Sequence, residues 1–142
     1  MFSNILLPID LGSLESQEKA IGTAAVMAEN QEARLHILSI VPDLGAGFVG
    51  SFFPRDFQAR AMEEARKQIE AFVLERFPGQ TNVSPLIAHG TIYQEILKVA
   101  EDSSADLIVL TSHHPEAKDY LLGTNASRVV RHAHCSVLVV RN

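Results

Sequence analysis

The residues best suited to bind a ligand follow an apolar run in the last third of the chain. The run 107–110 is followed by polar residues, and a helical pattern begins at residue 123. A helix start offers unpaired backbone N–H groups and the positive end of a dipole, which bind anions without dedicated side chains. Glycine at such a start lets the backbone approach a ligand closely, and hydroxyl, amide and imidazole groups add hydrogen bonds. The pattern therefore predicts a phosphate-binding segment formed by Thr111, Ser112, His113, His114, Gly123, Thr124 and Asn125.

Alternating strands and helices must position this segment. Short apolar runs predict five strands, and patterns of apolar and small residues at helical spacing predict four helices. Because the strands are continuous apolar runs between helices, they predict a doubly wound α/β fold with a parallel sheet covered on both faces. The strands are expected at 5–9, 35–41, 83–88, 105–110 and 136–140, and the helices at 13–30, 59–77, 91–100 and 123–132.

Ligands of doubly wound sheets bind at the carboxyl ends of the strands, where the strand order reverses. The first strand ends in Pro8 and Ile9 and is followed by Asp10, and the second ends just after Ile40. We therefore expect these residues to meet the segment that starts at Thr111. The stretch 43–57, which contains several glycines and phenylalanines, predicts a long loop that either closes over a ligand or packs against a second subunit.

Composition narrows the classes of partner. The chain has 142 residues, which suits one domain spanning 1–142, and a net charge of −5 gives no electrostatic reason to bind DNA or RNA. A small anionic ligand remains compatible with that charge, because a few local N–H groups hold a phosphate. No apolar run approaches the roughly 18 residues of a membrane span, and the first residues lack the basic region of a signal peptide. We expect a cytoplasmic protein without a membrane partner.

Histidine and cysteine residues beyond residue 130 have a structural interpretation. His132, His134 and Cys135 lie between the last helix and the last strand, where histidines complement a helix dipole. A single cysteine excludes an internal disulfide and is more often a small buried apolar residue than a reactive thiol. The adjacent histidines at 113 and 114 rarely converge on one ion in a loop, so we expect no metal site. For Gly123 and its neighbours, the alternative is an ordinary loop and helix cap.

Three stretches of the chain resemble the universal stress protein family. They are the opening ILLPID at 5–10, the turn at Gly90 with the helix after it as far as Leu97, and the long block 120–140. The resemblance covers nearly the whole chain and is strongest to small single-domain bacterial members of the F and G type. It implies the strand order 3-2-1-4-5 and homodimers that pair through the last strand. Dimer and tetramer stay open as alternatives for the full assembly.

In one subclass of that family, ATP is held by a motif of the form Gly-x2-Gly-x9-Gly-Ser/Thr. The pair Gly123-Thr124 matches the end of the motif. Thr111 and His114 stand where the two earlier glycines would be, and the interval 115–122 before Gly123 is one residue shorter than the motif's. A β-carbon at 111 or 114 occupies space that a glycine leaves free.

The resemblance also implies roles for individual residues. The carboxylate of Asp10 would bind the ribose hydroxyls, and the backbone of Ile40 would read the adenine edge. The start of the last helix would hold phosphate. The expected ligand is ATP or another adenine nucleotide, with or without Mg²⁺. The expected nucleotide contacts are Pro8, Ile9, Asp10, Ile40, Gly90, Thr111, Ser112, His113, His114, Gly123, Thr124 and Asn125.

More than one function is compatible with these features. The first is a homo-oligomeric stress-response module that binds an adenine nucleotide, with at most slow ATP hydrolysis or self-phosphorylation, because no acidic pair for a metal and no activated nucleophile is evident. The second is a nucleotide-free dimeric scaffold that uses its last strand. A phosphoacceptor receiver or a flavin-binding domain shares the fold plan, but Asp10 lacks the acidic neighbour that a receiver needs to hold magnesium.

Overall fold

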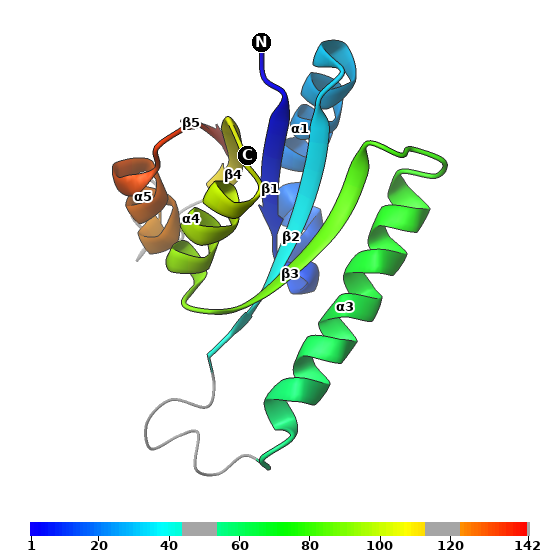
Figure 1. Ribbon diagram of the computed structural model, residues 1–142, viewed down its shortest axis with the longest axis vertical. Helices are drawn as coiled ribbons and strands as arrows, with labels where there is room; N and C mark the ends of the chain where they lie inside the picture. The colour runs from blue at the N-terminus through cyan, green and yellow to red at the C-terminus, as the bar shows by residue number, and fades with distance from the viewer. Residues whose placement is uncertain (44–53, 113–122, 142) are drawn as a thin grey trace.

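The computed structural model describes residues 1–43, 54–112 and 123–141. Its centre is a parallel sheet in the order β3-β2-β1-β4-β5, flanked by helices (Figure 1). The doubly wound α/β fold and the strand order 3-2-1-4-5 are therefore confirmed. The strands are β1 (Asn4–Ile9), β2 (Arg34–Pro42), β3 (Val83–Gly90), β4 (Leu107–Ser112) and β5 (Ser136–Arg141), and the helices are the 3₁₀ helix η1 (Leu11–Gln17), α1 (Glu18–Gln31), α3 (Phe57–Arg76), α4 (Ile92–Asp102) and α5 (Gly123–His132).

Two apolar cores cover the two faces of the sheet. Successive side chains of a strand point to opposite faces. Accordingly, Ile5 and Leu7 of β1 pack in the core beneath α1 and α3, whereas Leu6 packs in the core beneath α4 and α5. All three side chains are almost completely buried, and burial of each contributes about 1.5–3 kcal/mol. The continuous apolar runs in the sequence thus reflect strands that are buried on both faces.

Several element boundaries differ from those expected. The third and fourth strands continue through polar residues, because β3 pairs as far as Gly90 opposite Pro42 of β2, and β4 pairs as far as Ser112 opposite Arg141 of β5. Pairing uses backbone groups, so a strand does not have to end where its apolar side chains end. At its other end, β4 begins at Leu107 and not at residue 105.

The helix expected from residue 13 begins at Glu18 instead. The preceding turn is the 3₁₀ helix η1, and Ser13 has a non-helical backbone with φ −141° and ψ 42°. The amide of Gln17 donates to the carbonyl oxygens of Asp10 and Ser13, both at 2.8 Å. These bonds keep the chain in a tighter turn before α1 starts. Among the residues described, no helix combines the length and apolar character needed to cross a membrane.

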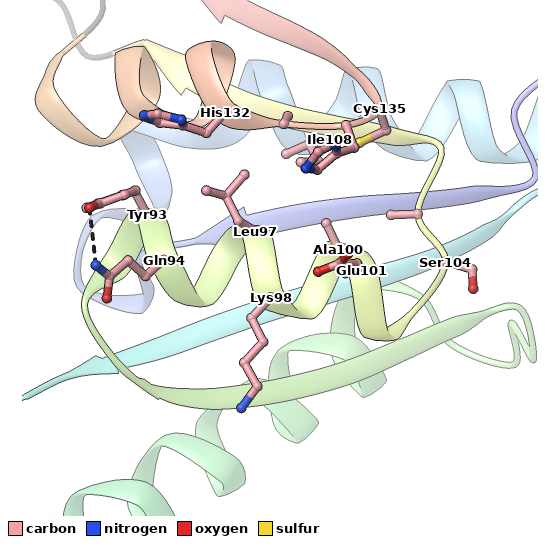
Figure 2. Close-up of a pocket in the computed structure, with 13 residues that line it drawn as sticks. Tyr93, Gln94, Leu97, Lys98, Ala100, Glu101, Ser104, Ile108, His132 and Cys135 are labelled. Carbon is pink, nitrogen blue, oxygen red and sulfur yellow. Dashed lines mark hydrogen bonds between the residues drawn. The ribbon is translucent and has the colours of Figure 1, made fainter.

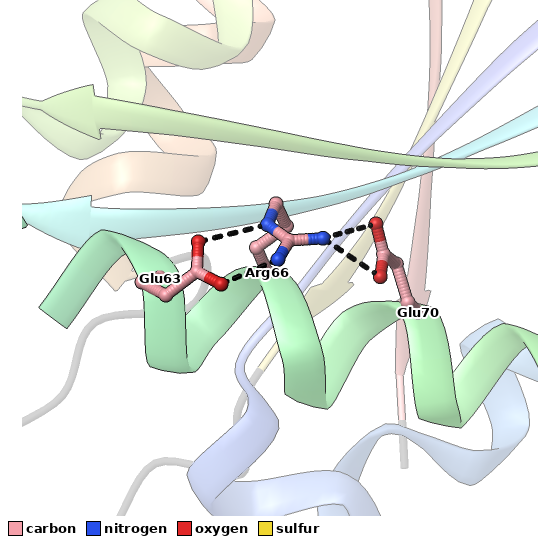
Figure 3. A network of polar contacts seen from close by, with 3 residues as sticks. All are labelled: Glu63, Arg66 and Glu70. Atoms are coloured by element: carbon pink, nitrogen blue, oxygen red, sulfur yellow. Dashed lines mark hydrogen bonds and ion pairs between the residues drawn. The ribbon is translucent and has the colours of Figure 1, made fainter. Parts of the chain in front are cut away.

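The outer face of α3 carries a network of charges. Arg66 bonds the carboxylate of Glu70 at 2.9 and 3.0 Å and also pairs with Glu63 (Figure 3). The hydrogen bonds lower the pKa of Glu63 and raise the pKa of Arg66. A second pair, Arg76 with Glu18, joins the end of α3 to the start of α1 at 2.8 and 2.5 Å. Such exposed pairs contribute little, so the buried side of α3 determines where it lies.

Candidate functional site

Strands β1 and β4 separate at their carboxyl ends. Only Ile5 and Leu6 of β1 are in register with β4. Successive residues of a strand direct their backbone N–H and carbonyl groups to the neighbouring strands on either side in turn. The carbonyl of Asn4 points to the β4 side, because it accepts a hydrogen bond from the N–H of Asp106, just before β4, at 2.9 Å. Even-numbered residues of β1 therefore face β4, and the next donor after Leu6 would be Pro8. Proline has no N–H, so the ladder ends there and the strands part.

The side chain of Gln17 forms hydrogen bonds with the backbone groups of Asp10 that are left unpaired where β1 and β4 separate. Its side-chain oxygen accepts from the N–H of Asp10 and its amide nitrogen donates to the carbonyl of Asp10, both at 2.8 Å. One carboxylate oxygen of Asp10 accepts from the N–H of Gly12 at 2.9 Å, and Asp10 itself is exposed. Within the described residues, its second carboxylate oxygen makes no hydrogen bond. Asp10 is thus fixed in position with an acceptor left for a ligand.

A cavity of about 480 Å³ lies where the strands part, which is the size of a site for a small molecule. Its wall is largely apolar, with side chains such as Ile40, Ile96 and Leu110. Its polar groups come from Ser39 of β2, from Asp10 just after β1, from the end of β4, from η1 and α3, and from the first turn of α5. The described lining residues are Pro8, Ile9, Asp10, Leu11, Gln17, Ser39, Ile40, Val41, Pro42, Ala65, Gln68, Ile92, Ile96, Leu110, Thr111, Gly123, Thr124, Asn125 and Ala126.

The structure brings most of the expected site residues together in this cavity. Gly90 and Ser112 lie outside its lining. Gly90 has φ +143°, and a β-carbon there would lie 3.0 Å from Cγ of Glu95, so glycine is needed for the close approach of that side chain. Ser112 is buried at the end of β4, with 2% of its surface exposed. His113 and His114 fall outside the described residues. The residues that line the cavity as expected are Pro8, Ile9, Asp10, Ile40, Thr111, Gly123, Thr124 and Asn125.

The amino end of α5 forms one side of the cavity. Its first four residues, 123–126, line the wall, and no acidic residue occurs in its first turn. Gly123 has φ +63°, a conformation that favours glycine, and a β-carbon there would meet no atom of the described residues within 4 Å. Arg131 and His132 lie in the last turn, where positive charge complements the dipole. The expected role of His132 at a helix end agrees with this placement.

Sequence reasoning missed the residues that α3 and η1 contribute. Ala65 and Gln68 are three positions apart and so share one side of α3, and both line the cavity. Gln17 is only 3% exposed and acts on Asp10. The spacing of Ala65 in the apolar pattern of its helix was a usable signal. A buried glutamine at position 17 left no signal in the pattern.

A second cavity, of about 720 Å³, lies at the opposite, amino ends of β4 and β5. Figure 2 shows Leu97 of α4 pointing toward the segment that carries His132 and Cys135, whereas Lys98 points away. Burial raises the pKa of the Cys135 thiol, which is therefore neutral at physiological pH. In the described ranges, no group of three or more His, Cys, Asp or Glu side chains is placed to hold a metal ion. Its wall includes Tyr93 and Gln94 from the first turn of α4 and His132 from the last turn of α5.

Comparisons with known proteins agree with this architecture. The model of the universal stress protein family matches residues 1–141. Universal stress protein G of Escherichia coli O157:H7 is 29% identical over 143 aligned positions, which cover 99% of this chain and all of that protein. The solved structure of MJ0577, a universal stress protein of Methanocaldococcus jannaschii, superposes with a TM-score of 0.81 at 26% identity, covering 100% of this chain and 97% of that one.

A more distant structure shares the fold and contains a ligand. It is a universal stress protein in complex with cAMP, with a TM-score of 0.62 at 21% identity, covering 98% of this chain and 96% of that one. The whole-chain family match and the full-length relative together confirm the resemblance seen in ILLPID and in the block 120–140. The chain belongs to the universal stress protein family.

Proposed function

We propose that this protein binds an adenine nucleotide, ATP or a related one, in the cavity between β1 and β4. The observation that carries the proposal is the placement of three complementary surfaces around one space of about 480 Å³: an apolar wall, the carboxylate of Asp10 and the amino end of α5. A nucleotide has a flat apolar base, sugar hydroxyls that donate hydrogen bonds, and anionic phosphate. The cAMP held by a protein of the same fold supports this ligand class.

Each surface has a role in this proposal. The apolar wall beside Ile40 receives the base, whose edge bonds the backbone of β2. Asp10 accepts hydrogen bonds from ribose hydroxyls, because an ionised carboxylate is purely an acceptor. Backbone N–H groups at 123–125 hold the phosphate, and the dipole of α5 stabilises its charge. Mg²⁺, where it accompanies ATP, is expected to bind chiefly through phosphate oxygens.

We further propose that the protein is a cytoplasmic binding module of the stress response and not a committed enzyme. The described cavity wall offers one carboxylate, Asp10, which supports binding over metal-assisted phosphoryl transfer. Association into homodimers, and of dimers into tetramers, is proposed to use β5, an edge strand with half-buried Val137, Leu138 and Val139. Edge strands of this kind are commonly paired or covered. A nucleotide-free scaffold is the second candidate, favoured by the same edge.

Titration calorimetry of the nucleotide-stripped protein with ATP tests the proposal. The variant Asp10→Asn keeps the acceptor that bonds Gly12 but loses charge and one acceptor. We expect about tenfold weaker ATP binding, the effect of a lost charge-assisted hydrogen bond. The control Asp102→Asn, at the exposed end of α4, is expected to bind like the original chain. Failure of the original chain to bind millimolar ATP would leave the scaffold as the better account.

A further inference from the structure

The hydroxyl of Thr111 is a buried polar group of the cavity wall that has no hydrogen-bond partner among the described residues. Thr111 is the next-to-last residue of β4, and its backbone is in register with Val140 of β5. An unpaired buried hydroxyl is unfavourable, and an apolar side chain of the same shape folds equally well or better. The described contacts of the fold therefore gain nothing from this oxygen atom.

The surroundings of Thr111 indicate what the hydroxyl would bond. It shares the cavity with the first turn of α5, the helix that follows β4 and packs on it. The backbone N–H groups of 123–126 and the positive end of the helix favour an anion at this side. A threonine hydroxyl can add one more donor there. Rotation about the Cα–Cβ bond exchanges the hydroxyl and methyl positions between staggered rotamers, so the donor can turn to a ligand without backbone movement.

We propose that Thr111 is a specificity-determining contact of the nucleotide site, whose hydroxyl donates a hydrogen bond to a phosphate oxygen of the bound ligand. This inference rests on the function proposed above. Under this proposal, Thr111 favours ligands that place an oxygen acceptor next to the first turn of α5. It also explains why a polar side chain occupies a position where an apolar one would fold at least as well.

Two substitutions separate the hydroxyl from the methyl group. Thr111→Val keeps the shape and removes the donor, whereas Thr111→Ser keeps the donor and removes the methyl group. Thr23→Val is the matched control, because the hydroxyl of Thr23 bonds the carbonyl of Lys19 on α1 at 2.7 Å, away from the cavity. Calorimetric titration with ATP gives the affinities, and urea unfolding without ligand gives the stabilities.

We expect Thr111→Val to bind ATP about tenfold more weakly, Thr111→Ser to remain within about threefold of the original chain, and Thr23→Val to be unchanged. The valine variant should also unfold at an equal or higher urea concentration. Unchanged ATP affinity in Thr111→Val, or an equal loss in the valine and serine variants, would overturn the inference while leaving the proposed function intact. Absence of binding by the original chain would overturn the proposed function itself.

Discussion

At the scale of single residues, the site depends on side chains that hold backbone groups in place before a ligand arrives. The amide of Gln17 bonds both the N–H and the carbonyl of Asp10, and the Asp10 carboxylate bonds the N–H of Gly12. Because these bonds are made within the protein itself, binding does not have to order this turn. Preorganisation of this kind reduces the conformational entropy that binding costs.

Gly123 offers a test of the backbone at the start of α5. Its φ of +63° is strained for an alanine, although a β-carbon would meet none of the described residues within 4 Å. We expect Gly123→Ala to lower the free energy of unfolding by about 1–2 kcal/mol and to weaken ATP binding, because the first turn of α5 shifts to relieve the strain. Gly123→Asn should lose less, since asparagine tolerates this conformation. Urea unfolding and calorimetric titration measure the two effects.

Gly22 is the matched control for that experiment. It lies in α1, and a β-carbon there also meets nothing within 4 Å, but its φ is not positive. Gly22→Ala should therefore raise the free energy of unfolding by about 0.5–1 kcal/mol through helix propensity and leave ATP binding unchanged. Equal stability of Gly123→Ala and the original chain would contradict the argument from backbone strain.

At the scale of elements, one proline and one glutamine open the sheet where the site forms. Pro8 ends the β1–β4 ladder, and Gln17 satisfies the N–H of Asp10 that would have continued it. The amino end of α5 and the side of α3 that carries Ala65 then close the space around the parted strands. The cavity is thus a consequence of a local break in backbone pairing within a regular sheet.

This origin explains what could be predicted from the sequence. Continuous apolar runs identified the strands, and the rule that parallel strand ends converge brought Asp10 and Gly123 to one site. The contribution of Gln68 and Gln17 depends on how α3 and η1 pack, which no local pattern encodes. The ends of β3 and β4 were misjudged for a related reason, since Gly90 and Ser112 continue their strands through backbone pairing alone.

The sheet also contains a histidine that should make stability depend on pH. His36 of β2 is half-buried. Within the part of the chain that the structure describes, its Nδ1 has no hydrogen-bond partner, and its Nε2 lies 3.5 Å from Oδ1 of Asn4. Burial, with a smaller contribution from Arg34, lowers the pKa of His36 below its usual value near 6.5. The unfolded chain therefore binds a proton more readily than the folded one. Its contribution to stability is present above pH 6.5 and declines as the pH falls below that value.

We expect His36→Gln to reduce this decline. Urea unfolding at intervals between pH 7.5 and 5 should give a shallower loss of unfolding free energy for His36→Gln than for the original chain. His134→Gln is the control, because His134 is exposed, and its curve should parallel that of the original chain. Parallel curves for all three proteins would contradict a lowered pKa of His36 in the folded protein.

At the scale of the whole molecule, the two edges of the sheet differ. The N–H of Leu35 bonds the carbonyl of Asn82 at 2.8 Å, so even-numbered residues of β3 face β2 and odd-numbered ones face outward. Pro85 therefore stands on the free edge of β3, where a missing N–H hinders an added strand. No proline occurs in β5, the opposite edge. This asymmetry supports pairing of copies through β5.

A proline in β5 tests that pairing. Successive residues of β5 direct their N–H groups alternately toward β4 and away from the sheet, so of the neighbouring variants Leu138→Pro and Val139→Pro one removes an outward donor and the other an inward one. By sedimentation, we expect the original chain to be dimeric, and the variant that lacks the outward donor to be monomeric with an unchanged circular dichroism spectrum. The variant that lacks the inward donor should instead lose stability. Two folded variants that both remain dimeric would exclude pairing through this edge.

The central claim is that an adenine nucleotide binds where β1 and β4 part. The most direct measurement is a titration of isotope-labelled protein with ATP, followed through the backbone amide resonances by nuclear magnetic resonance. We predict saturable shifts that are largest at Asp10 and at 123–126, with little change at Leu97, Glu101 and Cys135 around the second cavity. Shifts centred on those three residues, or none at millimolar ATP, would contradict the account.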